Sequence, residues 1–352
     1  MEQLFRPIAL RVKGMNSEGA VGVTACYAEG EHEATVTLYN LDCADAFPLI
    51  EGLSIDALIT DPPYFLDRLA SNWDLPALEK TTQGAVVQSL PAGMKFDPRQ
   101  GKEFQAFMGK VAAEGLRVLK PGGFFLAFSA PRLYHRLGVA VEDAGFEVRD
   151  MWAWLYTQNQ VKAMSVERFL DPTALSSNEL DTVREELKNW KTPQVKSCLE
   201  PIVFAQKPRL DADGKPLTFL ENWLRHHVGL VDINTSMGEE ADMSTANIMT
   251  TGPISSALDK AFLVSKPSRA ERGQTSHVSV KPLALMEQLI RATVPAGGTV
   301  LDPFNGSGST GIAALSLGRN YIGFETSLEY FMQSQSRFAT AFGEQLSPWE
   351  SV

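Results

Sequence analysis

Asp61, Pro62, Pro63 and Tyr64 follow directly on the apolar run 55–60, which has the pattern of a buried strand. Asp61 would then stand just past the carboxyl end of a strand, where open α/β sheets bind ligands. The two prolines fix two φ angles and remove two amide donors, which leaves the Asp61 carboxylate and the Pro62 carbonyl as acceptors. Two acceptors beside an aromatic ring suit an exocyclic amino group on a flat base, on which Tyr64 can stack. A plain Asp-Pro turn is the competing interpretation.

The segment 306–311 (GSGSTG) matches the pattern G-x-G-x-x-G, follows a strand-like run and opens a helix-like one. Its glycines allow the backbone to approach a ligand closely, and Glu325, after the next apolar run, can bind a ribose diol. Asp302 would repel a pyrophosphate but suits an ammonium group or the water around an amino acid. The loop therefore favours S-adenosylmethionine over a dinucleotide, and a tight turn without a ligand is the alternative.

The composition indicates a globular protein and excludes several other classes of protein. The chain has 352 residues, of which 44% are hydrophobic and 21% charged, as is ordinary for a globular protein. Cys26, Cys43 and Cys198 are too few and too scattered for a disulfide framework or a Cys-x-x-Cys metal site. No apolar run approaches the roughly 20 residues that span a bilayer, and the N-terminus has no clean signal-peptide core. We therefore expect a cytoplasmic protein without a membrane partner.

The formal net charge of −10 argues weakly against nucleic acid as a partner, because a polyanion prefers basic surfaces. Two local clusters differ from this average. Residues 184–209 hold six Lys or Arg against three Glu, and residues 260–281 hold five against one. Net charge describes average behaviour and leaves room for a local basic groove, although a solvated face is the ordinary interpretation of such runs.

Short apolar runs alternate with segments of helical periodicity along most of the chain. The predicted strands are 34–42, 55–61, 124–129, 146–156, 199–208, 298–304 and 321–325, with a turn at 119–123. The predicted helices are 104–119, 131–144, 281–294, 310–317 and 328–342. This alternation indicates an α/β fold with a doubly wound, mostly parallel sheet.

Taken together, the motifs resemble those of the DNA amino-methyltransferases, which form N6-methyladenine or N4-methylcytosine. The segment 61–64 (DPPY) is similar to their catalytic motif, and 300–314 is similar to their cofactor-binding motif. Further segments resemble counterparts in the family, namely 37–47, 119–128, 277–290 and 318–325. Each motif alone is unspecific, whereas the combination is specific. Asn305 departs from the family, in which a small residue is commoner, and we do not expect it to abolish cofactor binding.

The resemblance implies S-adenosyl-L-methionine as the cofactor and requires no metal. The catalytic residues that it implies are Asp61, Pro62, Pro63 and Tyr64. For Asp42 it implies contact with the adenine ring of the cofactor, and for Glu325 contact with the ribose. His277 is expected to have a structural or cofactor-side role. The full implied cofactor-binding set is Asp42, Cys43, His277, Lys281, Pro282, Asp302, Pro303, Phe304, Gly306, Ser307, Gly308 and Glu325.

The catalytic motif precedes the cofactor motif, an order that resembles the beta group, a circular permutation of the family sheet. The implied fold is a Rossmann-like S-adenosylmethionine-dependent methyltransferase sheet with an inserted target-recognition region. The predicted parts are a catalytic half (1–157), an insertion with DNA contacts (158–197), a strand of the catalytic domain (198–207), the target-recognition region (208–276) and a cofactor-binding half (277–352).

The predicted function is site-specific methylation of N6 of a flipped adenine in double-stranded DNA. Aspartate as the first residue of DPPY favours adenine, because serine is the more frequent form for cytosine. The alternatives are N4-cytosine methylation, methylation of RNA or of a protein glutamine amide, a dinucleotide oxidoreductase, and a catalytically silent nucleic-acid-binding module. A homodimer and a cognate restriction endonuclease are candidate partners. The candidate phosphate contacts are Lys188, Lys191, Lys196, Lys266, Arg269 and Arg272.

Overall fold

The structure, a computed structural model, describes residues 6–13, 22–29, 32–64, 98–156, 163, 165–167, 170, 176–192, 199–233, 248–250, 262–263, 267–268, 272, 275 and 280–343. Its strands are β1 (Arg6–Lys13), β2 (Gly22–Glu29), β3 (His32–Tyr39), β4 (Ile55–Thr60), β5 (Leu119–Phe128), β6 (Glu147–Leu155), β7 (Leu199–Gln206), β8 (Ile248–Thr250), β9 (Phe262–Leu263), β10 (Thr299–Asp302) and β11 (Asn320–Phe324). Its helices are α1 (Cys43–Ala46), the 3-10 helix η1 (Phe47–Leu49), α3 (Pro98–Val118), α4 (Tyr134–Asp143), α5 (Ser177–Leu187), α6 (Phe219–His226), α8 (Leu283–Thr293), α9 (Ser309–Ser316) and α10 (Leu328–Phe342).

The strands of the described residues form one sheet in the order β1-β2-β3-β11-β10-β4-β5-β7-β6-β8-β9. The five strands from β3 to β5 in this order are parallel to one another. Antiparallel pairs flank them, with β1 and β2 on one side and β7 and β6 on the other. The predicted α/β fold with a mostly parallel sheet is confirmed, and its antiparallel flanks are an addition that the sequence did not reveal.

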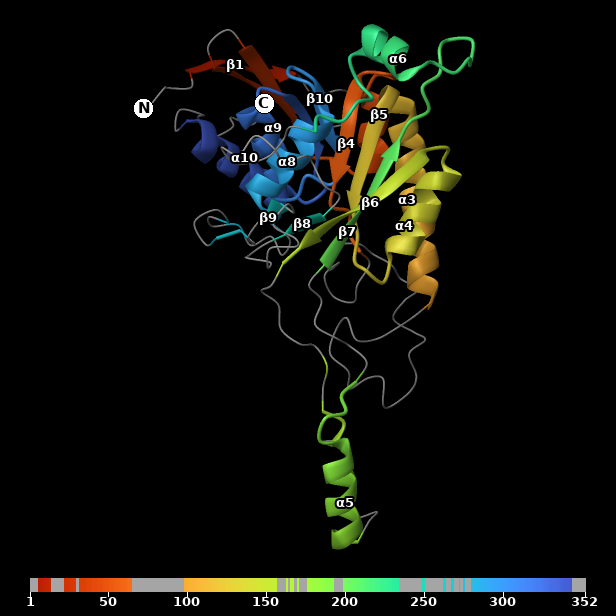
Figure 1. Ribbon diagram of the computed structural model, residues 1–352. Coiled ribbons are helices and arrows are strands. Elements are labelled where there is room, and N and C mark those ends of the chain that lie inside the picture. The colour runs from red at the N-terminus through yellow and green to blue at the C-terminus, as the bar shows by residue number, and fades with distance from the viewer. Residues whose placement is uncertain are drawn as a thin grey trace.

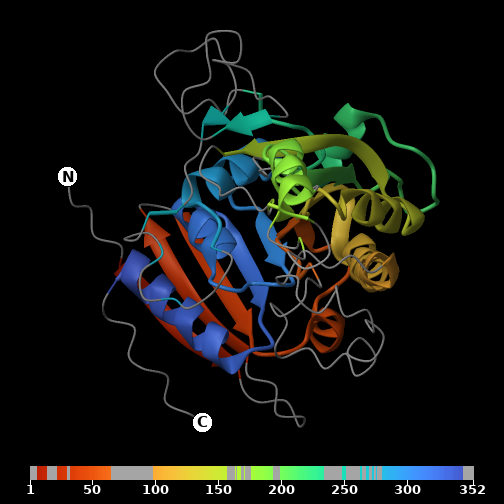
Figure 2. The same ribbon diagram turned by 90° about the horizontal axis from the view of Figure 1, so that it is seen from below.

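Helices cover both faces of the sheet, as a parallel sheet requires. Every residue of β4 is buried. Ala57 and Ile59 pack in one apolar cluster with residues of α8, α9 and α10, and Leu58 packs in a second cluster with residues of α3 and α4. Figures 1 and 2 show these two groups of helices on opposite sides of the sheet. Because successive side chains of a strand point to opposite faces, a continuous apolar run such as that of β4 joins both clusters.

The two halves of the chain meet in the middle of the sheet, where β10 lies between β11 and β4. Asp56 joins them at the amino ends of the strands, since it accepts hydrogen bonds from the Thr299 amide at 2.8 Å and from Lys120 Nζ at 2.8 Å. Thr60 joins them at the carboxyl ends by donating to Asp302 Oδ1 at 2.6 Å. The sheet thus brings the motif at 61–64 beside the glycine loop that follows β10.

The predicted turn at 119–123 was wrong. Residues from Leu119 onward belong to β5, although Gly122 has a φ of +80° and the pairing with β4 is irregular between Ile55 and Ala57. The Pro-Gly-Gly sequence therefore produces an irregularity inside a strand. Pairing of β5 with its neighbours overrides the local turn signal.

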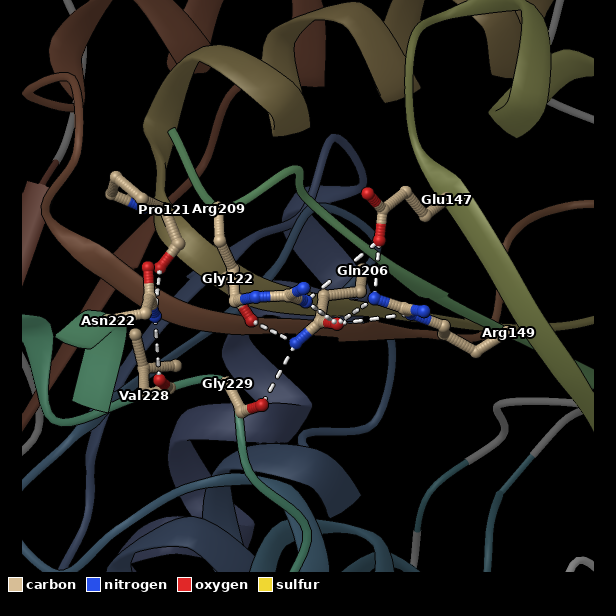
Figure 3. A network of polar contacts seen from close by, with 9 residues as sticks. All are labelled: Pro121, Gly122, Glu147, Arg149, Gln206, Arg209, Asn222, Val228 and Gly229. Carbon is tan, nitrogen blue, oxygen red and sulfur yellow. Dashed lines mark hydrogen bonds and ion pairs between the residues drawn. The ribbon is translucent and has the colours of Figure 1, made fainter. Parts of the chain in front are cut away.

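The segment 207–231 is attached to the edge of the sheet opposite the carboxyl end of β4. Gln206 ends β7, and its side-chain oxygen accepts from Arg149 Nη2 at 2.8 Å and from Arg209 Nη1 at 3.1 Å. Its amide donates to the carbonyl oxygens of Gly122 at 2.9 Å and Gly229 at 3.0 Å, as Figure 3 shows. Gln206 is 2% exposed, so its amide group connects buried backbone from two parts of the chain to two arginine side chains.

Asn222 in α6 makes a second connection of the same kind. Its side chain is completely buried and donates to the carbonyl oxygens of Pro121 at 3.0 Å and Val228 at 2.9 Å (Figure 3). The Arg209 guanidinium lies 3.6 Å from the centroid of the Phe219 ring. These contacts hold the first part of the predicted target-recognition region at the edge away from residues 61–64.

The insertion between β6 and β7 leaves the sheet at the other edge. β7 is antiparallel to β5, and the Ser129 amide donates to the carbonyl of Pro201 at 2.9 Å, so the start of β7 lies beside the carboxyl end of β5. Figure 1 shows α5 well away from the sheet on this side. In the described part of the chain, no helix is long and apolar enough to cross a membrane.

Candidate functional site

Four neighbouring parallel strands each lead to an acidic residue at their carboxyl ends. Asp42 follows β3, Glu325 follows β11, Asp302 ends β10 and Asp61 follows β4. Because the carboxyl ends of parallel strands meet at one edge, four residues from distant parts of the sequence form one acidic row. Ligands of open α/β sheets bind at this edge.

Asp61 has protein donors on both carboxylate oxygens. The Tyr64 hydroxyl donates to Oδ1 at 2.6 Å, and Lys281 Nζ forms a hydrogen-bonded ion pair with Oδ2. Burial, together with the negative charge of Asp61, holds the pKa of Tyr64 well above its usual value, so this phenol stays a neutral donor. Pro62 is buried beside them. The motif predicted to carry catalysis is thus a compact cluster with Asp61 at its centre.

Lys281 lies between two carboxylates. Its side chain is 7% exposed, and Nζ also forms an ion pair with Glu200 Oε2 at 3.3 Å. The ammonium lies 4.8 Å from the centroid of the Phe128 ring. Burial lowers the pKa of Lys281, but the charges of Asp61 and Glu200 outweigh burial and raise it overall. Lys281 is therefore a charged, buried donor between Asp61 and Glu200.

Asp302 is 2% exposed, and donors face both of its carboxylate oxygens. Oδ1 accepts from the Thr60 hydroxyl at 2.6 Å and from the Phe304 amide at 3.0 Å, and Oδ2 accepts from the Thr310 hydroxyl at 2.7 Å. Burial raises the pKa of Asp302 to about 6 in spite of these hydrogen bonds. The carboxylate therefore joins β4, β10 and α9 and carries a charge that the fold solvates poorly.

The loop after β10 turns sharply at glycine. Gly306 and Gly308 have φ angles of +51° and +80°, which L side chains rarely adopt. Glu325 accepts from the Gly306 amide at 2.9 Å and from the Ser327 amide at 2.8 Å. Burial raises the pKa of Glu325 against the lowering effect of these two bonds. The predicted ribose-binding acid thus lies directly beside the predicted cofactor loop.

Asp42 lies at the other end of the acidic row. It caps α1 by accepting from the Ala44 amide at 2.9 Å. Asn40 Nδ2 donates to the Glu325 carbonyl at 2.7 Å, which ties this turn to the end of β11. Cys43 differs, because its side chain packs in the core and burial raises the pKa of its thiol to about 12. The Cys43 thiol is therefore part of the core and not of the acidic row.

The row of acids fits S-adenosylmethionine. That molecule carries positive charge on its sulfonium and ammonium groups and has ribose hydroxyl donors, so carboxylates suit each of these groups. A pyrophosphate would meet Asp302 and Glu325 instead of donors and positive charge. Within the described residues, no group of three or more His, Cys, Asp or Glu side chains is arranged to hold a metal ion.

A sequence model of the family described as DNA methylase, the N6/N4 type, matches residues 55–336. The chain belongs to this DNA methylase family. The match spans both DPPY and the glycine loop, so it covers the two segments that the sheet brings together. S-adenosyl-L-methionine is the methyl donor of the family, and DNA is its substrate.

Two proteins are similar to the DNA methylase over most of their length. Type II methyltransferase M.HindIII of Haemophilus influenzae is 28% identical over 307 residues, which cover 82% of this chain and 90% of that protein. Type II methyltransferase M2.LlaDCHI of Lactococcus lactis subsp. cremoris is 25% identical over 322 residues, covering 91% and 94%. The solved structure of PvuII DNA methyltransferase (cytosine-N4-specific) is 16% identical with a TM-score of 0.51, covering 87% and 91%, and shows the shared fold.

The structure of the DNA methylase brings most of the predicted site residues together. DPPY, the glycine loop and Asp302 lie at adjacent strand ends, with Lys281 on Asp61. Phe304 also packs against Phe107 of α3, with the ring centroids 5.7 Å apart. The remaining predicted residues at this edge are Pro282, which precedes α8, Pro303 and Ser307, all of them buried. His277 and the predicted phosphate contacts Lys196, Lys266 and Arg269 lie outside the described residues.

Glu200, Thr60 and Thr310 belong to the site but were missed from the sequence. The two threonines lie next to predicted motifs, so their hydroxyls could have been anticipated as partners of Asp302. Glu200 is a single acid near the start of the apolar strand β7. A charged residue in an otherwise apolar run was the one available signal for it.

Proposed function

We propose that this DNA methylase transfers a methyl group from S-adenosylmethionine to the N6 amino group of an adenine turned out of duplex DNA. The observation that supports this most is the position of DPPY at the end of β4, beside the glycine loop that follows β10. Aspartate in the first position of DPPY favours adenine over cytosine. S-adenosylmethionine supplies a methyl group activated by the sulfonium.

Asp61 and Pro62 would hold the amino group of the base. The Asp61 carboxylate and the Pro62 carbonyl accept its two hydrogens, which directs the nitrogen lone pair away from them. Pro62 is buried, its ring fixes its φ angle and the following Pro63 restricts its ψ angle, so the carbonyl is held in one direction. Positioning of this kind provides most of the rate in such a reaction. Asp61 does not have to be a strong base, because the amino proton becomes acidic only as the new N–C bond forms.

Tyr64 would stack on the base. Its hydroxyl donates to Asp61, and its raised pKa keeps it neutral, so it contributes a ring face and a donor but no charge. Turning a base out of the duplex costs a few kcal/mol, which stacking on an aromatic ring offsets in part.

The acidic row would bind the cofactor. From the family resemblance we assign Glu325 to the ribose hydroxyls and Asp42 to the adenine ring, and the two residues follow the adjacent strands β11 and β3. Asp302 and the backbone of residues 306–308 would face the amino-acid part. Lys281 is the one lysine or arginine among the predicted cofactor contacts, and its contact with Asp61 would place it between the two ligands.

DNA contacts would come from segments at the catalytic edge. The insertion 158–197 leaves the sheet there, whereas 207–231 is bound to the opposite edge. We therefore propose that base recognition lies in 232–276 and in the insertion. A homodimer and a cognate endonuclease remain predictions from the family resemblance.

Labelled methyl transfer tests the proposal. We expect methyl groups from S-adenosylmethionine to appear in duplex DNA, and nucleoside analysis to find N6-methyladenine. Asp61→Ala should lower the rate by about 100-fold or more, because it removes a positioning acceptor. Asp143→Ala, which removes an exposed acid of α4, should not change it.

The products of this experiment distinguish the proposed function from its alternatives. N4-methylcytosine as the product would replace adenine by cytosine and leave the remaining roles unchanged. If the protein bound S-adenosylmethionine and DNA but transferred no methyl group to any duplex, it would be a silent binding module and the proposal would be wrong.

A further inference from the structure

Both carboxylate oxygens of Asp61 already accept a hydrogen bond from the protein. In this structure Tyr64 occupies Oδ1 and Lys281 occupies Oδ2. A carboxylate oxygen can accept two hydrogen bonds, so an incoming amino group either shares an oxygen of Asp61 with one of these donors or displaces that donor. The Tyr64 hydroxyl is neutral, whereas Lys281 carries a full charge and is almost fully buried.

Moving Lys281 away from Asp61 is unfavourable unless another carboxylate receives it. A buried ammonium without a partner loses both its hydration and its ion pair. Glu200 is already in contact with Lys281, with Oε2 at 3.3 Å from Nζ. A small rotation of the lysine toward Glu200 would therefore keep the ammonium paired while Asp61 Oδ2 becomes available.

The surrounding strands hold Glu200 in place for this role. Glu200 lies opposite Trp154 in the ladder between β7 and β6, and β7 runs antiparallel to β5. This direction brings the start of β7 to the catalytic edge. The centroid of the fully buried Phe128 ring lies 4.8 Å from the Lys281 ammonium, so the ammonium contacts the face of this ring. A cation can shift over such a ring while it keeps a favourable contact.

We propose that Glu200 is a positioning residue that shares Lys281 with Asp61 and retains the lysine when the substrate amino group takes its place on the Asp61 carboxylate. The inference rests on the proposed methyl transfer, since it assigns a partner to the same site. Among the described residues, the titratable groups around Lys281 are Asp61 after β4 and Glu200 on β7, with Tyr64 bonded to Asp61 and Tyr156 acting on Tyr64.

Glu200→Gln tests the role by removing the charge at nearly constant shape, and Glu200→Asp is the conservative variant. We expect Glu200→Gln to lower kcat by about 10- to 100-fold and to change KM for DNA and for the cofactor by less than about 3-fold. A misplaced Lys281 affects the geometry of the reacting groups more than it affects binding. Glu200→Asp should recover part of kcat. The matched control is Glu142→Gln, an exposed acid on α4, which should behave as the wild type.

The pH profile distinguishes positioning from a purely structural role. Glu200 raises the pKa of Lys281, so removing it should move the alkaline limb of kcat to lower pH. An alkaline limb at the wild-type position, or an unchanged kcat, would overturn the inference.

A second readout does not depend on methyl transfer. The folded-state pKa of Lys281 is raised, so its ion pairs stabilise the fold fully at neutral pH and lose that effect as pH rises through this pKa. In Glu200→Gln the free energy of unfolding should begin to fall at lower pH than in the wild type and in Glu142→Gln. Urea unfolding between pH 8 and 11 measures this difference. If the wild type transfers no methyl group, the proposed function fails, and this unfolding series still decides whether Glu200 holds Lys281.

Discussion

At the scale of single residues, the structural position of Asp302 and its proposed role in cofactor binding act against each other. The buried carboxylate joins Thr60 to Thr310, and its negative charge suits the ammonium of the cofactor. Without a cation beside it, that charge destabilises the fold, because burial raises the pKa to about 6. Stability and cofactor binding should therefore respond in opposite directions to loss of the charge.

Asp302→Asn tests this balance. The raised folded pKa means that the ionised carboxylate destabilises the fold above about pH 6, and that the effect disappears below about pH 4. Relative to the variant, the wild type should lose roughly 3 kcal/mol of unfolding free energy between these pH values, since one pKa unit corresponds to about 1.4 kcal/mol. Urea unfolding from pH 4 to 8 measures the difference, and isothermal titration should show weaker binding of S-adenosylmethionine to the variant. A pH-independent difference in stability would contradict the explanation.

Asn305 shows how a departure from the family pattern is accommodated. Its side-chain Oδ1 accepts from the hydroxyl of the fully buried Tyr321 at 3.0 Å, and its backbone N–H donates to the Phe324 carbonyl at 2.8 Å. A small residue at this position would leave the Tyr321 hydroxyl without this acceptor. Asn305 therefore belongs to the packing of the loop against β11, and its effect on cofactor binding stays a prediction.

At the scale of elements, the close approach of α9 to α10 depends on glycine. A Cβ at Gly311 would lie 2.5 Å from Phe338 Cζ and 2.5 Å from Tyr321 Cδ1. Both rings are buried, so neither can move aside freely. The third glycine of the loop motif thus serves helix packing, while the first two serve the turn.

Gly311→Ala should lower the free energy of unfolding by about 1–3 kcal/mol or more, because the added methyl overpacks a filled core. It should also weaken cofactor binding, since α9 begins directly after the glycine loop. The control is Gly109→Ala in α3, where a Cβ meets nothing within 4 Å. That change should raise stability by about 0.5–1 kcal/mol through helix propensity. If denaturant unfolding gave the two variants equal stability, α10 would have to be able to move away from α9, and the explanation would be wrong.

Elements with strong periodicity were predictable from sequence, and those set by distant pairing were not. β4, β10 and β11 are buried in a parallel sheet, so their apolar runs are unambiguous. β5 was cut short in the prediction because Pro121 and Gly122 signal a turn that the neighbouring strands override. The direction of β7 could not be deduced locally, and Glu200 was missed for that reason.

At the scale of the whole molecule, the sheet explains why the order of the motifs can be reversed. β10 and β4 are neighbours, although one lies near the end of the chain and the other near its start. The site depends on the adjacent ends of β4 and β10, and the 2.6 Å hydrogen bond between Thr60 and Asp302 shows this adjacency. The order of the motifs is visible in the sequence, and the family resemblance implied a circularly permuted sheet. The hydrogen bond between Thr60 and Asp302 that joins the two halves is visible only in the structure.

The net charge of −10 requires that DNA binding come from local basic groups, and α5 does not supply an unopposed set. Its helix carries four acids against the single base Arg184, and Lys188 pairs with Glu185 at 3.2 Å. Both members of this pair are exposed, so the pair itself adds little stability, but the nearby acids disfavour phosphate. The predicted phosphate contacts Lys188 and Lys191 should therefore contribute little to affinity.

The double variant Lys188→Gln with Lys191→Gln tests this prediction. The control is Lys102→Gln with Lys110→Gln, which changes two exposed lysines of α3 and alters the net charge by the same amount. Each phosphate contact adds about 0.9 to the slope of log affinity against log salt concentration. We expect both double variants to keep the wild-type slope within about 1 in fluorescence anisotropy titrations at several salt concentrations. A slope reduced by about 2 in the α5 variant alone would show that both lysines contact phosphate, and the acidic surface of α5 would then have to face away from the duplex.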